Sequence, residues 1–183
     1  MHLTIDPLRP PATPDEVGDA GDAFREFYAF QRTLATAHYG TPDVAASPGE
    51  VLGRCHDSAA HRVVILVARL GGRVVGAAEA WIPQLEDLDL IEGGWALDPS
   101  LPDADARVTA AALVDAVMTL GTTEGRPLLT FEAPCEPGTL VPSSGVGGVD
   151  PTGVFSEALL ARGFTVEQTL RYQVADLAAI PIP

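Results

Sequence analysis

Residues 88–99 read Leu-Asp-Leu-Ile-Glu-Gly-Gly-Trp-Ala-Leu-Asp-Pro, and this stretch decides the fold. Its apolar residues predict a strand over 88–97, and the pair Gly93-Gly94 predicts a β-bulge or a close approach by another backbone. A helix is predicted over 103–120, with an apolar stripe and Gly121 as its C-terminal stop. Residues 127–132 then form a short strand. Because a helical crossover joins these two strands, we expect them to be parallel.

Upstream of this unit the pattern alternates between helix and strand. Two valine-rich strands, 62–70 and 73–82, flank Gly71-Gly72 and predict a tight hairpin. Two segments, Thr13–Glu16 and Ser47–Glu50, have the form of a capping box with proline at the first helical position. They predict a helix through the Phe24–Leu34 region and a short one ending near Arg54. Residues 1–6 are consistent with an edge strand.

Downstream, a loop of about twenty residues precedes a helix expected from Asp150-Pro151 to Arg162, which Gly163 ends. Residues 164–177 form a last extended segment. The complete order predicts an α/β fold, with a mixed, mostly antiparallel central sheet and helices on both faces. We expect residues 1–177 to form one domain and residues 178–183 to be a tail or linker.

Composition excludes several classes of function. The chain has 183 residues, with 25 acidic against 11 basic ones and a formal charge of −14. Such a surface repels phosphate backbones, so we expect no nucleic-acid partner. The longest apolar run, residues 63–68, is too short for a bilayer, and the N-terminal residues carry no secretory pattern. Two cysteines make no disulfide framework. We therefore expect a cytoplasmic protein with no membrane partner.

Three segments carry a resemblance to a known family: residues 73–82, residues 90–99 and residues 155–177, the last reading FSEALLARGFTVEQTLRYQVADL. The chain resembles the GNAT superfamily of N-acetyltransferases over residues 1–177, best from residue 62 onward. Within it, the chain most resembles one half of actinobacterial proteins with two such domains in tandem. The resemblance implies a GNAT-like sheet whose central parallel strands splay apart, and a homodimer or a second GNAT domain as a possible partner.

The resemblance also implies acetyl-CoA as acyl donor and a small-molecule or peptide amine as acceptor. In the family the pantetheine arm pairs with the central strand, which corresponds here to Trp95, Ala96 and Leu97. The phosphates bind at the start of the next helix. The residues that match this phosphate site are Arg107, Val108, Thr109 and Ala110.

A carboxylate in the family takes the proton of the attacking amine, and Glu92 matches it. Burial between strands would raise the pKa of such a base toward neutrality. Glu79 and Glu132 lie on the flanking strands, where they could form an acidic acceptor pocket or be rim charges. The resemblance thus implies direct transfer of an acetyl group to a primary amine, with Glu92 as general base.

The chain departs from the family at two places. In the phosphate loop, Val108 replaces the central glycine and Asp105 replaces a basic residue, with Asp103 close by. On the last helix, Leu159 stands where many members have a tyrosine that protonates the leaving thiolate. These departures favour an alternative, a catalytically silent GNAT-like domain with a structural or protein-interaction role. A ligand sensor without turnover also fits.

Other conspicuous residues have simpler interpretations. The spacing of Cys55, His56, Asp57 and His61 matches no zinc pattern, so we expect no metal site. Cys135 is interpreted as a loop cysteine and residues 143–148 as a flexible surface loop, at most a lid. We expect Trp81 and Trp95 to pack in the core.

Overall fold

The described part of the chain contains one five-stranded sheet. The computed structural model describes residues 2–132 and 153–165. The elements in chain order are β1 (Leu3–Pro7), α1 (Asp19–Tyr39), the 3₁₀ helix η1 (Pro42–Val44), α2 (Pro48–Cys55), β2 (His61–Leu70), β3 (Arg73–Pro83), β4 (Leu90–Leu97), α3 (Asp103–Glu124), β5 (Leu128–Glu132) and α4 (Val154–Leu160). The strands lie side by side in chain order, antiparallel except for the parallel pair β4–β5. The predicted α/β class and the parallel final pair are confirmed.

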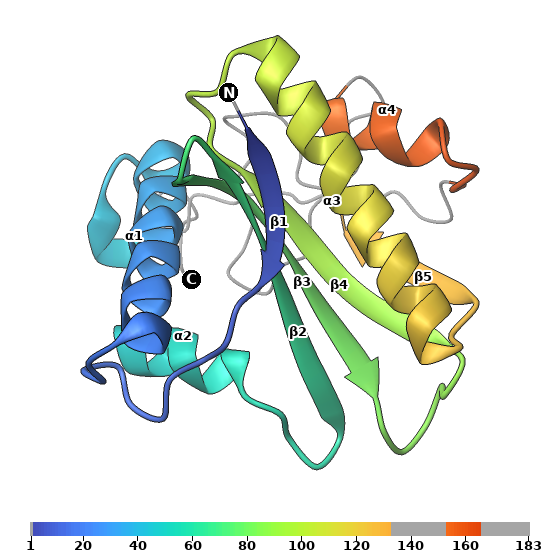
Figure 1. Cartoon of the computed structure of the whole chain (residues 1–183), viewed down its shortest axis with the longest axis horizontal. Helices are drawn as coiled ribbons and strands as arrows, with labels where there is room; N and C mark the ends of the chain where they lie inside the picture. The colour runs from blue at the N-terminus through green and yellow to red at the C-terminus, as the bar shows by residue number, and fades with distance from the viewer. Residues whose placement is uncertain (1, 133–152, 166–183) are drawn as a thin grey trace, which may run out of the picture.

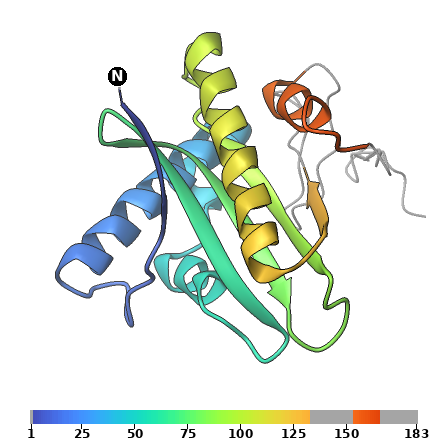
Figure 2. The ribbon, with the colours of Figure 1, turned by 45° about the vertical axis from the view of Figure 1, so that its right-hand side comes forward.

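Helices cover both faces of the sheet, as Figures 1 and 2 show. On one face α3 and α4 bury a core with Ala78 and Trp95 of the sheet. On the other face α1 and α2 pack on Ile65, Val67 and Ala77. Neighbouring strand residues contribute to opposite cores because successive side chains alternate across a strand. Two apolar layers therefore exclude water from both sides of the central strands.

The β2–β3 hairpin follows the sequence prediction. Gly71 and Gly72 have φ of 59° and 87°, the left-handed values that a two-residue turn of this type needs. The predicted bulge at Gly93-Gly94 is wrong, since both glycines stay in register with β3 and with β5. The irregularity in the sheet lies instead between β2 and β3, at Ala68 and Arg69.

The start of α1 differs from its prediction. The residues of the proposed capping box form a turn, in which Glu16 N–H donates to Thr13 O at 3.1 Å, and α1 begins only at Asp19. A Cβ on Gly21 would lie 1.8 Å from the Glu16 carbonyl oxygen. The chain before α1 therefore folds back onto the first turn of the helix, and Gly21 makes room for it.

The end of α3 also differs from its prediction. Gly121 lies inside the helix, because it packs under Leu129 of β5, where a Cβ would be 2.9 Å from Leu129 Cδ2. Gly125 ends the helix instead, with φ of 66° and its N–H donating to helix carbonyls. The predicted capping box of α2 is present, with reciprocal bonds between Ser47 and Glu50.

Helix α4 starts at Val154, after Gly153 as its N-cap, rather than at the predicted Asp150-Pro151. Residues 150–152 are outside the described part. Gly163, with φ of 87°, lies in the turn that follows the helix, as expected for a C-terminal stop. The predicted last strand and the tail at 178–183 fall outside the described residues, apart from Phe164 and Thr165.

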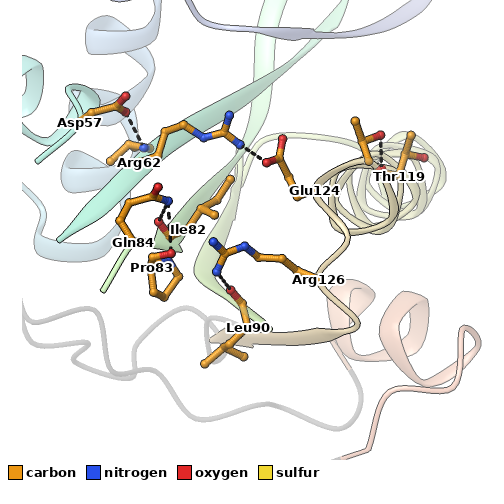
Figure 3. Close-up of polar contacts among 11 residues, drawn as sticks. Asp57, Arg62, Ile82, Pro83, Gln84, Leu90, Thr119, Glu124 and Arg126 are labelled. Atoms are coloured by element: carbon orange, nitrogen blue, oxygen red, sulfur yellow. Dashed lines mark hydrogen bonds and ion pairs between the residues drawn. The ribbon is translucent and has the colours of Figure 1, made fainter. Parts of the chain in front are cut away.

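Two arginine side chains connect the end of α3 and the start of β5 to the sheet at the end where β4 begins (Figure 3). Arg62 of β2 forms an ion pair with Glu124, the last residue of α3, at 2.6 Å. Arg126 donates to the carbonyl of Leu90 at 3.2 Å, and Leu128 N–H donates to the Asp89 carbonyl at 3.1 Å. The first residues of β4 and β5 are thereby held together. Within the described ranges, no helix is long and apolar enough to cross a membrane.

Substitutions of two helical glycines, one packed and one in open space, test the described packing at the start of α1. Gly21→Ala should lower the free energy of unfolding by about 2–4 kcal/mol, because its methyl group would collide with the Glu16 carbonyl. Gly53→Ala, in α2 with no atom within 4 Å of a new Cβ, should raise it by about 0.5–1 kcal/mol. Urea titrations measure both changes. Equal effects of the two substitutions would contradict the described start of α1.

Candidate functional site

Strand β4 is paired differently along its two edges. On one edge β3 pairs with it from Glu92 to Leu97. On the other edge the described pairing with β5 runs only from Leu90 to Gly94. The last three residues of β4, Trp95–Leu97, therefore extend past the end of this pairing.

The direction of the backbone groups at this end follows from one hydrogen bond. Asp98 N–H donates to the Val75 carbonyl at 2.9 Å, so the polar groups of Asp98 and Ala96 face β3. In an antiparallel pair these groups alternate from one residue to the next, so Leu97 N–H is directed away from β3. The Trp95 side chain is buried against Phe155 of α4, with ring centroids 5.4 Å apart, which confirms the prediction that it packs in the core. Trp81 is only partly buried.

Five residues, 98–102, separate the end of β4 from the start of α3. The first helical hydrogen bond is from Ala106 N–H to the Pro102 carbonyl, at 2.9 Å. The N–H groups that this leaves without a helical partner are those of residues 103–105. The predicted phosphate-binding residues Arg107, Val108, Thr109 and Ala110 lie one turn further along, where backbone N–H groups bond within the helix. Their backbone thus cannot provide the expected anion site.

The side chains of that second turn have other contacts. Arg107 forms an ion pair with Glu157 of α4, a contact that was not predicted from the sequence. Thr109 is buried and donates to the Asp105 carbonyl at 2.7 Å, and Ala110 is fully buried. Val108 points to solvent with 59% of its surface exposed. Arg107 is consequently the one charged group of this set, and a carboxylate already contacts it.

Glu79 and Glu92 lie on the sheet face that α1 and α2 cover. Glu79 of β3 accepts a hydrogen bond from Gln31 of α1, which identifies this face. Glu92 pairs with Trp81, two residues further along β3 than Glu79, so its side chain is on the same face. Glu92 is exposed, so the expected burial between strands is wrong. The backbone of Glu132 pairs with Gly94, whereas its side chain lies outside the described part.

The carboxylate of Glu79 is partly buried and accepts one long hydrogen bond from a side chain. Gln31 Nε2 is 3.4 Å from its Oε1, a long distance for a hydrogen bond. Burial raises the pKa of the Glu79 carboxyl, and the positive charge of Arg54 at the end of α2 offsets part of this shift. The sequence could not reveal this environment, because Gln31 and Arg54 come from two different helices.

Cys55 lies close to this carboxylate but is not reactive. Its thiol is buried and donates to the Val51 carbonyl at 3.1 Å. Burial, with a smaller contribution from the charge of Glu79, raises the pKa of this thiol to about 12. A neutral buried thiol is a poor nucleophile and metal ligand. Among the described residues no group of three or more potential metal ligands occurs.

The side chain of Asp98 holds the chain between β4 and α3 in one conformation, a role that was not predicted from the sequence. Its carboxylate accepts hydrogen bonds from the N–H and Oγ of Ser100, at 2.8 and 2.6 Å, and pairs with Arg73. These bonds hold the pKa of Asp98 below its usual value although burial acts in the opposite direction. The Asp-Pro-Ser order was a usable signal, since aspartate commonly bonds the backbone two residues on.

Leu159, at the position of the family's tyrosine acid, is buried with α3 and β4 in the core. It therefore packs and donates no proton. Cys135, residues 143–148 and the final segment after Thr165 lie outside the described residues.

Comparison with known proteins identifies the fold. No protein-family model and no curated protein matches the sequence. Among solved structures, an aminoglycoside N-acetyltransferase of type AAC(6')-Iy in complex with CoA is 14% identical, with 96% of this chain and 95% of that chain covered and a TM-score of 0.56. A ribosomal-protein-alanine N-acetyltransferase from Brucella melitensis biovar Abortus 2308 is 15% identical over 96% and 99%, with a TM-score of 0.56. A tandem GNAT protein from the clavulanic acid biosynthesis pathway is 18% identical over 88% of this chain and 43% of that chain, with a TM-score of 0.59.

These likenesses extend over nearly the whole chain, while identity stays at 14–18%. They establish the architecture, because very different sequences can share a fold and differ in their sites. The chain has the GNAT fold that its sequence resemblance implied.

Asp98 gives a pH-dependent test of the β4–α3 connection. Because its pKa is lowered in the folded state, its contribution to stability is complete above the unfolded value of about 4 and is lost as pH falls through the folded value. Asp98→Asn should therefore lower the free energy of unfolding by about 1–3 kcal/mol at pH 7. Asp89→Asn, at an exposed loop position, should change it by less than about 0.5 kcal/mol. A deficit in Asp98→Asn that persists unchanged at pH 2 would contradict this assignment.

The pH dependence of stability that Glu79 contributes should have the opposite sign to that of Asp98. Its raised pKa means that the folded state binds the proton more tightly, so stability falls as pH rises from the unfolded value of about 4.3 toward the folded one. Glu79→Gln should remove this slope and raise the free energy of unfolding by about 1 kcal/mol at pH 7. Thermal unfolding between pH 4 and 8 measures the effect. A loss of stability in Glu79→Gln at pH 7 would show that the carboxylate has a partner that stabilises its charged form.

Proposed function

We propose that this domain is an N-acetyltransferase that transfers an acetyl group from acetyl-CoA to the primary amine of a small molecule or peptide. The observation that carries the proposal is the end of β4, where Leu97 N–H turns away from β3 beyond the described pairing with β5. A strand edge of this kind binds an extended amide chain as an added strand. The GNAT fold over nearly the whole chain supports the same function, since the AAC(6')-Iy structure of that fold contains CoA.

The end of β4 suits the amide-containing pantetheine arm of the donor. Trp95, Ala96 and Leu97 would lie along this arm, and the Leu97 N–H is a preorganised donor for an acyl oxygen. Asp98 contributes by holding the chain that follows β4 in one conformation. Bound acetyl-CoA would supply the activated acetyl thioester, which the chain itself does not contain.

Glu92 is proposed as the general base. It lies three residues before Trp95 on the same strand, about 10 Å along β4 at the usual strand rise. Its exposed side chain is on the sheet face that α1 and α2 partly cover, so an acceptor would approach β4 from this face. Since Glu92 is exposed, it can accept the proton of a protonated amine directly or through water.

Glu79 and Glu132 are proposed to bind the acceptor. A partly buried carboxylate with one long hydrogen bond gains most from a cationic ligand, because buried charge is costly until it is paired. Glu79 and Glu92 are diagonal neighbours on adjacent strands, a separation of about 7–8 Å. The proposed acceptor is therefore a cationic amine.

A second candidate is a catalytically silent domain with a structural or interaction role. Two specific observations favour it: Leu159 is buried in the core, and Arg107 is already paired with Glu157. Under this alternative the GNAT fold would persist without acetyl transfer, and a partner such as a second GNAT domain would explain its retention.

Activity with Glu92→Gln separates the two candidates. With acetyl-CoA at millimolar concentration and a panel of polyamines, aminosugars and peptide amines, release of free CoA thiol should be detectable with at least one acceptor. Glu92→Gln should lower kcat by about 10²–10⁴-fold, because the ammonium loses its proton acceptor. Glu86→Gln, exposed in the β3–β4 loop, is the matched control and should keep full activity. Binding of neither donor nor acceptor would support the silent domain.

A further inference from the structure

We propose that the donor site recognises the pantetheine arm of its thioester and not the pyrophosphate, so that pantetheine and CoA bind with similar affinity. This inference rests on the proposed function and concerns the class of donor. It follows from a mismatch between the start of α3 and the polyanion that a CoA thioester would bring there.

The first turn of α3 already carries negative charge. The N–H groups available to an anion belong to residues 103–105, and two of these residues are Asp103 and Asp105. Aspartates in a first turn interact favourably with the positive end of the helix dipole. The charge that would attract a pyrophosphate is thus partly neutralised by the helix's own side chains, and the carboxylates repel the ligand.

No cation compensates for these aspartates in the first two turns. Arg107 is the only basic residue of α3, and Glu157 of α4 pairs with its guanidinium. Near the start of α3 there are thus one arginine, Arg107, and three carboxylates, those of Asp103, Asp105 and Glu157. Arg73, the basic residue of the strand beside the end of β4, is paired with Asp98. Within the described residues near this helix start, the basic groups therefore have carboxylate partners.

The first turn of α3, residues 103–106, also contains no glycine. A phosphate approaches a helix start most closely where a side chain is lacking. By contrast, the pantetheine arm is uncharged and needs only the amide groups of a strand edge, which β4 supplies at Leu97.

Calorimetric titration of the wild-type protein with pantetheine, 4′-phosphopantetheine and CoA tests the inference directly. The expected dissociation constants agree within about threefold, since each added phosphate meets carboxylates. Raising the salt concentration from 20 to 300 mM should tighten CoA binding, because screening weakens repulsion, and should leave pantetheine unchanged. CoA binding at least tenfold tighter than pantetheine, and weakened by salt, would overturn the inference while leaving the proposed function intact.

Charge variants provide the second test. Asp103→Asn with Asp105→Asn should tighten CoA binding by roughly 5–20-fold without affecting pantetheine. Glu157→Gln, which releases Arg107, should act in the same direction. Asp15→Asn with Asp19→Asn removes the same charge next to the start of α1, at the other end of the sheet, and should change neither affinity (Figure 1). Unchanged CoA affinity in both site variants would contradict the inference.

The outcomes also separate this inference from the proposed function. If the wild-type protein binds neither pantetheine nor CoA, the acetyltransferase proposal itself fails and so does the inference. If it binds both equally and the site variants favour CoA, both stand. The salt series on the wild-type protein remains decisive where a variant does not fold.

Discussion

A parallel strand cannot follow its neighbour through a hairpin, so β5 reaches β4 only through the long crossover of α3. The rest of the structure depends on this constraint. It brings the start of α3 to the end of β4, and it brings the end of α3 to the start of β4, where Arg126 contacts the Leu90 carbonyl. The start of the β4–β5 pair is therefore held by the end of α3, whereas at the other end the last three residues of β4 extend past the described pairing with β5.

The side chains and backbone groups of β4 point in different directions. The side chains of β4 alternate between faces, so Glu92 lies with α1 and α2, while Trp95 packs against α4. The N–H of Leu97 is directed away from β3, beyond the described pairing of β4 with β5. A donor along the edge and an acceptor on the α1–α2 face could thus meet at β4 without competing for the same groups. The carboxylates of Asp98 and Glu79 have different surroundings: Asp98 is buried and bonded to the connection into α3, whereas Glu79 is partly buried on the face of α1 and α2.

Sequence reasoning predicted the elements well where local patterns determine them. The Gly71-Gly72 hairpin, the capping box of α2 and the parallel crossover each depend on a few neighbouring residues. It was wrong at two helix ends, where the chain folds back onto a glycine. Gly121 lies inside α3 with Leu129, eight residues further on, packed against it, and Gly21 lies in the first turn of α1 against the carbonyl of Glu16, five residues before it. Helix-stop and capping patterns do not describe such fold-back contacts.

For the candidate site, too, some features could be predicted from the sequence and others could not. The strand edge, Glu92 and Glu79 could be assigned from a resemblance and from strand alternation, but the environment of each could not. Glu92 is exposed rather than buried, and Arg107 faces Glu157 rather than a ligand. The start of α3 at residue 103 agrees with the sequence prediction, whereas the position of Arg107, Val108, Thr109 and Ala110 one turn inside the helix was not apparent from the match to the family's motif.

The electrostatics at the start of α3 connect stability with function. Asp103 and Asp105 stabilise a helix whose N-cap, Pro102, offers no side-chain hydrogen bond. The acidic first turn therefore supplies part of the stabilisation that a side-chain cap would give at this end of α3. The same carboxylates repel a polyanion, so the residues that favour the helix also act against the pyrophosphate of a CoA donor at this helix start.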